Sequence, residues 1–415
     1  MNLVDGKILA ADECESVLDS LEDRLLATLE KDRLNPETVV AACGRLVEGL
    51  DEDFFLAQME PLGISPAQGR QYIAEAKEMF RAETLRRRLR TELGVDLTRI
   101  EPLGTLLHVA AGNMDGLPAF SVLEGLLTGN INILKLPAEE GGVSVSLLRE
   151  LIREEPILAE YIYVFDYSSR DVLHIKKLLS AADAVVVWGG DEAVMAFRTM
   201  VKPNTKLIEW GHKVSFGYVT RAGLSEEGLS DFARNIAETG QMLCSSCQGL
   251  FLDTEDLGEV YSLCERFVPL LTRAAADISG IGMAAQATLE LYTAELEALK
   301  TGERVFRGEG YGAIARSGNK LESAPAPRVP WVKPLPRKSI IRTLRPYKNH
   351  LQTVGLLCGD DERDMLARLF FKTGAVRVTT GERMSRAEIN MPHDGEYPLR
   401  RYTKVVSRPL PRFIS

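Results

Sequence analysis

The sequence predicts an α/β protein built on parallel sheets that helices cover on both faces. From about residue 100 onward, short apolar segments alternate with longer segments of helical periodicity. Strands that alternate with helices indicate βαβ units. Some of the apolar segments, such as AVVVW at 184–188, contain no polar residue. Continuously apolar strands are typical of parallel sheets that are buried on both faces.

The alternation runs through two regions. In the first, we expect strands at 104–112, 131–137, 161–166, 184–190 and 206–211, and helices at 117–129, 143–154, 170–181 and 191–201. In the second, we expect strands at 214–219, 248–253, 350–358 and 375–380, and helices at 225–240 and 361–374. Residues 15–95 are predicted to be helical, with a helix start at Ser65-Pro66. The proline-rich segment 323–339 is expected to be extended, and the polar residues 391–415 form a tail.

Composition limits the classes of function. The 59 acidic residues outnumber the 50 basic ones, which gives a net charge of −9. An acidic chain lacks the broad positive field that attracts nucleic acid or an anionic membrane surface. The N-terminal residues MNLVDGKILAADECE lack the apolar core of a secretory signal, and no stretch is apolar enough for a membrane helix. We therefore expect a cytoplasmic protein with no nucleic-acid partner and no membrane span.

The densest chemical signal is the pair of segments KLIEWGHK at 206–213 and QMLCSSCQ at 241–248. Glu209 at a strand end and Cys244 in a loop could meet in one cleft, and a reactive thiol needs a lowered pKa or a nearby base. Three other interpretations stay open at this point. Cys244 could be a small buried apolar residue, and Cys244 with Cys247 could form a redox pair or half of a zinc site.

Two strand ends carry further candidates. Asn113 follows the strand predicted at 104–112, where its amide could donate to a developing oxyanion or could simply cap the next helix. Gly189 and Gly190 lie between a strand and a helix start that includes Glu192. Such a turn lets main-chain N–H groups approach a pyrophosphate. The G-x-G-x-x-G fingerprint is absent, however, and a glycine pair in this position is common without any ligand.

Four segments in one order resemble the bacterial acyl-CoA reductase family, whose best-known members supply fatty aldehyde for bacterial luminescence. They are HVAAGNMDGLPAFSVLEGLLTGNINILKLP, DAVVVWGGDEAV, KLIEWGHKVSFGYV and QMLCSSCQ. The resemblance is strong over about residues 100–255, and it places the chain in the aldehyde-dehydrogenase superfamily. It implies an aldehyde-dehydrogenase-like fold with a helical N-terminal region, a doubly wound cofactor-binding domain and a second α/β catalytic domain.

The resemblance also assigns roles to residues. Cys244 is similar to the catalytic cysteine of the superfamily, and Asn113 to the residue whose amide completes the oxyanion hole. Glu209, in EWGHK, resembles the general-base glutamate, and His212 in the same segment is a second candidate for the proton. For the cofactor, the resemblance implies that Lys135 contacts the adenosine ribose. It places Gly189, Gly190 and Glu192 at the turn beside the pyrophosphate. No metal is implied.

The cofactor expected from this resemblance is NADPH. Many NAD-using members place an acid three residues after the lysine, where it binds the ribose 2′-hydroxyl. This chain has Ala138 there, so the carboxylate that would repel a 2′-phosphate is missing and Lys135 could pair with that phosphate.

The function that the resemblance implies is reduction of acyl-CoA to aldehyde through a cysteine thioester. The expected domains are 1–212 with the N-terminal helices and the NADP site, 213–385 with Cys244, and a tail at 386–415 that serves oligomerisation, in a homodimer. The alternatives are action on another activated acyl group or on an aldehyde, an acyl-carrying transfer protein that works with an acyl-protein synthetase, and a C-x-x-C redox protein.

Overall fold

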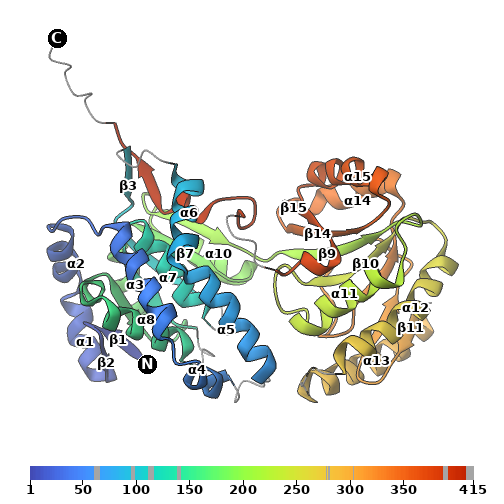
Figure 1. The fold of residues 1–415 in the computed structure, drawn as a ribbon, viewed down its shortest axis with the longest axis horizontal. Coiled ribbons are helices and arrows are strands. Elements are labelled where there is room, and N and C mark those ends of the chain that lie inside the picture. Colours follow the sequence, from blue (N-terminus) through green and yellow to red (C-terminus); the bar gives the residue numbers. More distant parts are fainter. Residues whose placement is uncertain are drawn as a thin grey trace, which may run out of the picture. The chain divides into compact units, whose positions relative to one another are not determined.

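The chain folds into two α/β units. The computed structural model describes residues 1–59, 66–94, 99–110, 116–137, 142–276, 278, 281–301, 303–386 and 391–407. One compact unit comprises Met1–Gly211 with Glu388–Ser415, and the other comprises His212–Ala387 (Figure 1). The predicted α/β class and the helical N-terminal region are both confirmed.

The first unit is built on a seven-stranded sheet in the order β2-β1-β6-β5-β4-β7-β8. The strands are β1 (Asn2–Val4), β2 (Lys7–Leu9), β4 (Thr105–Val109), β5 (Ile131–Lys135), β6 (Ile162–Phe165), β7 (Ala184–Trp188) and β8 (Lys206–Trp210). The five neighbouring strands β6, β5, β4, β7 and β8 pair in parallel, as predicted. β1 and β2 extend one edge as an antiparallel hairpin that the sequence did not indicate.

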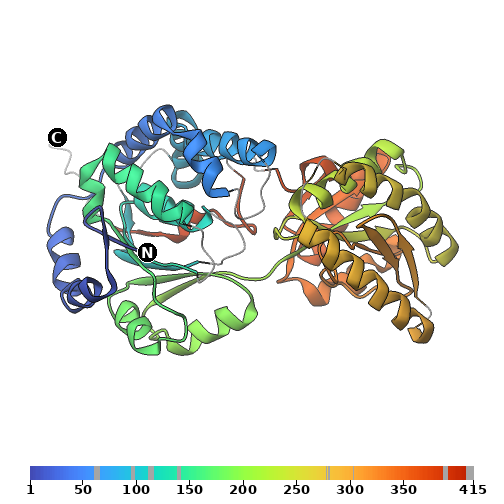
Figure 2. The same cartoon turned by 90° about the horizontal axis from the view of Figure 1, so that it is seen from below.

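Helices cover both faces of this sheet. α7 (Leu117–Leu127) and α8 (Val143–Glu154) lie on one face, and α9 (Val172–Ser180) and α10 (Asp191–Met200) lie on the other (Figure 2). The parallel part of the sheet therefore begins at β4 and winds outward to β5 and β6 on one side and to β7 and β8 on the other, with its switch point between β4 and β7. In such sheets ligands bind at the carboxyl ends of the strands at this point.

Six N-terminal helices belong to this unit: α1 (Ala11–Asp19), α2 (Leu21–Leu29), α3 (Pro36–Gly49), α4 (Glu52–Met59), α5 (Pro66–Phe80) and α6 (Ala82–Leu93). The last four, α3 to α6, add to the layer formed by α7 and α8, whereas α1 contacts α9 through the pairs Glu15–His174 and Asp19–Lys177. The start of α3 is well defined by its sequence. Asn35 caps the helix by accepting a hydrogen bond from the Glu37 amide, and Pro36 occupies the first helical position. Its buried face packs into the same core as α7 and α8.

The second unit is built on another seven-stranded sheet, in the order β11-β12-β13-β10-β9-β14-β15. Its strands are β9 (Val214–Val219), β10 (Cys247–Leu252), β11 (Arg304–Arg307), β12 (Gly312–Ala315), β13 (Trp331–Pro334), β14 (Leu351–Leu357) and β15 (Arg377–Thr379). β11 runs antiparallel to β12, and the other neighbours are parallel. The proline-rich segment thus contains β13, which lies inside the sheet.

Successive residues of the central strand serve the two faces of the second sheet. Phe216 and Tyr218 pack with α14 (Ile340–Leu344) and α15 (Asp360–Thr373). Val219 packs on the other side with α11 (Glu226–Thr239) and α12 (Leu257–Ala275). A separate apolar cluster joins α13 (Ile281–Thr301) to β12. Every residue of β9 and β10 is buried, and burial on both faces explains why their sequences are mainly apolar.

The C-terminal residues belong to the first unit. α16 (Pro398–Arg401) leads into β16 (Thr403–Val405), which pairs antiparallel with β3 (Ile100–Pro102). Tyr402 between them is fully buried, and its carbonyl accepts a hydrogen bond of 3.0 Å from the Asn130 amide. Across the described part of the chain, no helix has the length and apolar character needed to cross a bilayer.

Candidate active site

The loop that carries Cys244 joins α11 to β10 and is held rigidly. α11 ends at Gly240, which has φ of 56°, and Gln241 follows with φ of 61°. A left-handed conformation is costly for a residue other than glycine. The Gln241 side chain offsets that cost with hydrogen bonds at both ends, donating to the Cys247 carbonyl (2.9 Å) and accepting from the Val329 amide (3.1 Å). These bonds fix the path of the loop.

Cys244 itself is anchored to two strands of the second sheet. Its carbonyl accepts a hydrogen bond of 2.7 Å from the Ser215 hydroxyl at the start of β9. The same hydroxyl accepts from the Thr353 amide of β14 at 3.0 Å. The Gln352 side-chain amide donates to the Cys244 sulfur at 3.2 Å. The thiol therefore lies at the amino-terminal edge of the sheet with both its backbone and its sulfur positioned.

The two thiols of the C-x-x-C segment have different surroundings. Cys244 is partly exposed, whereas the other five cysteines are buried, and none of the six, all of which lie in described parts of the chain, forms a disulfide. Cys247 is 0% exposed, and its sulfur donates to the Gly249 carbonyl at 3.3 Å. Burial raises the pKa of Cys247 to about 12. Because the thiolate is the nucleophile, this difference favours Cys244 as the reactive thiol.

Two histidines lie at the same edge of the second sheet. His212 precedes β9 and is exposed, with its Nε2 3.5 Å from the Ser323 hydroxyl. His350 precedes β14, and its Nδ1 lies 3.3 Å from the His212 carbonyl. His350 was not among the candidates predicted from the sequence. The two histidines meet because β9 and β14 are parallel neighbours, which the spacing along the chain does not reveal.

Glu209 lies in the first unit, near the end of β8. Both of its carboxylate oxygens accept from Arg198 of α10, one of them at 2.6 Å. The Arg401 guanidinium donates to the Glu209 carbonyl at 3.1 Å and stacks on the ring of Trp210. Glu209 would therefore have to accept a proton while next to the Arg198 guanidinium. Arg198 was not among the residues singled out from the sequence.

The carboxyl ends of the strands in the first sheet carry the residues assigned to the cofactor. Lys135 ends β5, is 3% exposed, and donates from its Nζ to the Ser169 hydroxyl at 2.8 Å. Burial lowers the pKa of Lys135, and the Asp166 carboxylate partly opposes this shift. Asn113 and Ala138 lie outside the described residues.

The glycine turn lies at the same edge, across β4 from Lys135. Gly189 follows β7 and donates its main-chain N–H to the Trp210 carbonyl at 3.2 Å. Gly190 caps α10, and a Cβ atom added to it would meet no atom within 4 Å. The first turn of α10 contains Glu192, which is exposed. This edge therefore offers a buried ammonium group and an open main-chain surface, which suit a dinucleotide phosphate, and a carboxylate, which suits a ribose hydroxyl.

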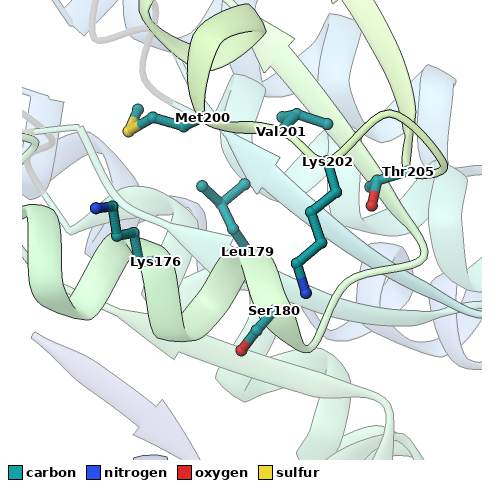
Figure 3. A pocket seen from close by; sticks show the side chains of 7 residues that line it. All are labelled: Lys176, Leu179, Ser180, Met200, Val201, Lys202 and Thr205. Atoms are coloured by element: carbon teal, nitrogen blue, oxygen red, sulfur yellow. The ribbon is translucent and has the colours of Figure 1, made fainter.

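A surface pocket of about 230 Å³ lies elsewhere on the first unit (Figure 3). It is lined by Lys176, Leu179 and Ser180 of α9 and by Met200, Val201, Lys202 and Thr205, which connect α10 to β8. These residues precede β7 and β8, so the pocket lies at the amino ends of those strands, opposite the glycine turn. Within the described residues, no three His, Cys, Asp or Glu side chains are grouped as a metal site.

Comparison with known proteins identifies the family. Residues 65–405 match the family model of acyl-CoA reductase (LuxC). The long-chain acyl-protein thioester reductase of Aliivibrio fischeri is 24% identical over 327 residues, which are 75% of this chain and 65% of that protein. Long-chain acyl-protein thioester reductase 2 of Photobacterium leiognathi is 24% identical over 328 residues, with the same coverage. The match spans less than two thirds of the length of these relatives.

Solved structures identify the fold. An NAD-dependent aldehyde dehydrogenase from Sinorhizobium meliloti superposes with a TM-score of 0.77 at 14% identity, covering 100% of this chain and 96% of that one. Glyceraldehyde-3-phosphate dehydrogenase GapN from Methanocaldococcus jannaschii, in complex with NADP, gives 0.72 at 12% identity, with coverage of 96% and 94%. The expected aldehyde-dehydrogenase-like fold is confirmed. The family match over most of the chain completes the identification: this chain belongs to the LuxC acyl-CoA reductase family.

Proposed function

We propose that the chain reduces a thioester-activated acyl group to an aldehyde with NADPH, and that Cys244 carries the acyl group. The observation that carries this proposal is the setting of Cys244. It is the accessible cysteine among six, and its sulfur accepts a hydrogen bond from Gln352. A positioned thiol with a hydrogen-bond donor on its sulfur suits covalent catalysis.

The reaction follows from the chemistry of the thiol. The Cys244 thiolate attacks the acyl carbonyl, a new C–S bond forms, and the thiol of the donor leaves. The resemblance assigns the oxyanion to the Asn113 amide and the Cys244 main-chain N–H. NADPH, when bound, supplies a hydride to the acyl group. The C–S bond then breaks, the aldehyde leaves and the Cys244 thiolate is restored. Glu209, His212 and His350 are the candidates for holding the proton.

The carboxyl edge of the first sheet supports a dinucleotide site. The Lys135 ammonium is held by Ser169 beside the strand end, and Gly190 leaves its main chain open to a close approach. We propose that Lys135 pairs with the 2′-phosphate of NADPH and that Glu192 contacts a ribose hydroxyl. Preference for NADPH over NADH rests on Ala138, which supplies no carboxylate against that phosphate.

The acyl donor has two candidates that differ in chemistry. The family description points to acyl-CoA, whereas the relatives are named as reductases of long-chain acyl-protein thioesters. The decisive experiment measures aldehyde formation from acyl-CoAs of increasing chain length and from an acyl-protein, each with NADPH and with NADH. Aldehyde from the thioesters with NADPH is the expected result. Aldehyde from acyl phosphates alone, or oxidation of aldehydes alone, would contradict the proposal.

The assembly state and cell location stay predictions of the sequence and its resemblance. We propose a homodimer in the cytoplasm, working with a synthetase that supplies acyl-protein. Sedimentation at several protein concentrations tests the dimer, and a monomer throughout would contradict it. A chain that takes up acyl groups but binds no NADPH would instead fit the transfer-protein alternative.

A further inference from the structure

We propose that Gln352 acts directly on the nucleophile, by donating a hydrogen bond that stabilises the thiolate form of Cys244. The inference rests on the proposed role of Cys244 and extends it to a second catalytic residue. Gln352 is the second residue of β14, separated from Cys244 by 108 positions in the sequence. No motif of the sequence pointed to it.

The geometry makes the bond a fixed feature of the site. The Gln352 Nε2 lies 3.2 Å from the Cys244 sulfur, and Gln352 is 7% exposed. The main chain of β14 is held on both sides at this point. The Gln352 carbonyl accepts a hydrogen bond from the Val376 amide at 3.0 Å, and the Thr353 amide donates one to the Ser215 hydroxyl. Ser215 in turn holds the Cys244 carbonyl at 2.7 Å. Strands β9 and β14 therefore position the donor and the acceptor together.

The bond favours the charged states of the reaction. A hydrogen bond to an ionised acceptor is about twice as strong as one between neutral groups, so the amide lowers the pKa of the Cys244 thiol relative to the same site without it. During attack it increases the fraction of thiolate. In the thioester the sulfur is uncharged and accepts weakly, and when the C–S bond breaks the amide stabilises the departing thiolate. Gln352 thus helps at both ends of the cycle.

Other ionisable side chains lie on the elements next to this pair. They are His212 and Lys213 before β9, His350 before β14, and Glu238 in the last turn of α11. The Lys213 ammonium donates to the Asn349 carbonyl at 2.8 Å. These groups remain in place when Gln352 is replaced, so a comparison between variants isolates the contribution of the amide.

The test is the pH dependence of iodoacetamide alkylation of Cys244, followed by peptide mapping. Because the other five cysteines are buried, Cys244 is the cysteine expected to react in the native protein. Gln352→Met keeps the length of the side chain and removes the donor. We expect the midpoint of alkylation to rise by about one pH unit, a roughly tenfold slower reaction below it, as for one lost hydrogen bond to a charged group. Gln352→Glu should raise it further, because a carboxylate would face the thiolate.

The control is Gln286→Met, which replaces an exposed glutamine of α13. Its midpoint should match that of the native chain. An unchanged midpoint in both Gln352 variants, each shown by its thermal melt to be folded, would overturn the inference. Alkylation needs neither acyl donor nor cofactor, so this failure is distinct from failure of the proposed function, which would show as aldehyde formation that survives Cys244→Ala.

Discussion

The two sheets of the molecule have a related topology, but their candidate functional residues lie at opposite ends of the parallel strands. In each sheet the first parallel strand is an interior strand, and the chain fills one side of it before crossing to the other, so each sheet has a switch point, at β4/β7 and at β9/β14. In the first sheet the candidate cofactor residues Lys135 and Gly190 follow the carboxyl ends of their strands. In the second sheet Cys244, Ser215 and Gln352 cluster at the amino ends.

The carboxyl ends of the second sheet are closed by polar contacts. Arg337, which follows β13, donates from its Nε to Asp253 at the end of β10 (2.7 Å) and from Nη2 to Glu362 of α15 (2.5 Å). The second carboxylate oxygen of Glu362 accepts from Thr220 at the end of β9 at 2.8 Å. Three strand ends and the start of α15 are thus tied together where the first sheet presents its open glycine turn. Topology alone therefore does not locate a site in this fold, because the residues at the strand ends decide whether those ends are open.

The sharpest test of this comparison is at the cysteine pair, where the expected effect is largest. Cys244→Ala should abolish covalent acylation and lower aldehyde formation by about 10³-fold or more, because it removes the thiol proposed to carry the acyl group, and the other five cysteines are buried. Cys247→Ser should keep most of both activities, since Cys247 is buried and its sulfur contacts the Gly249 carbonyl. Labelled acyl donor and peptide mapping identify the loaded thiol. Label on Cys247 alone would refute the assignment of Cys244 as the nucleophile.

The features of the fold that were predictable from the sequence are those set by local pattern. The run AVVVW of β7 has no polar face, so it was predicted as a buried strand, and it is fully buried between β4 and β8 of the first sheet. The hairpin of β1 and β2 escaped prediction because each strand has three residues and β2 is largely exposed. β13 was hidden by the prolines around it, although Trp331 is fully buried.

The residues of the candidate site also fall into those that local sequence predicts and those that depend on how the strands are ordered. Cys244 could be singled out because its segment resembles a family motif. Gln352 and His350 could not, because they reach the Cys244 edge through the strand order β10-β9-β14, and periodicity predicts strands without their order. The pairing of Glu209 with Arg198 was also hidden, because it depends on how α10 packs on its sheet.

The second prediction concerns Asn113, which lies outside the described residues. If its amide stabilises the oxyanion, Asn113→Ala should lower kcat by roughly 100- to 1000-fold with little change in stability. kcat and kcat/KM should fall equally, because the interaction is made in the transition state. If Asn113 only caps a helix, the variant should lose about 1 kcal/mol of stability and keep its turnover. A denaturant melt and steady-state kinetics on one preparation separate the two results.

The third prediction compares the two ends of the strands within the first sheet. Lys135→Met should weaken NADPH by about 10- to 100-fold and NADH less, because a charge-assisted hydrogen bond to the 2′-phosphate is lost. Lys176→Met, at the pocket on the opposite end of the strands, should leave both affinities unchanged. Fluorescence titration with each cofactor measures the effect. Equal losses for NADPH and NADH would mean that Lys135 contacts something other than the 2′-phosphate.

The smallest expected effect is at Gly190, where the question is whether the open main chain of the turn is used. A methyl group added by Gly190→Ala would meet no protein atom within 4 Å. The fold should therefore tolerate the change, at a cost of about 0.5 kcal/mol or less for a poorer helix cap. If a pyrophosphate approaches this turn, the methyl group occupies part of its space, and NADPH and NADH should both weaken by about tenfold or less. Gly318→Ala in the second unit, where an added Cβ also meets no atom, is the matched control and should bind both cofactors as the native chain does. Unaltered affinities in Gly190→Ala would mean that the turn is left open for no phosphate, and that the carboxyl edge of the first sheet holds the cofactor elsewhere or not at all.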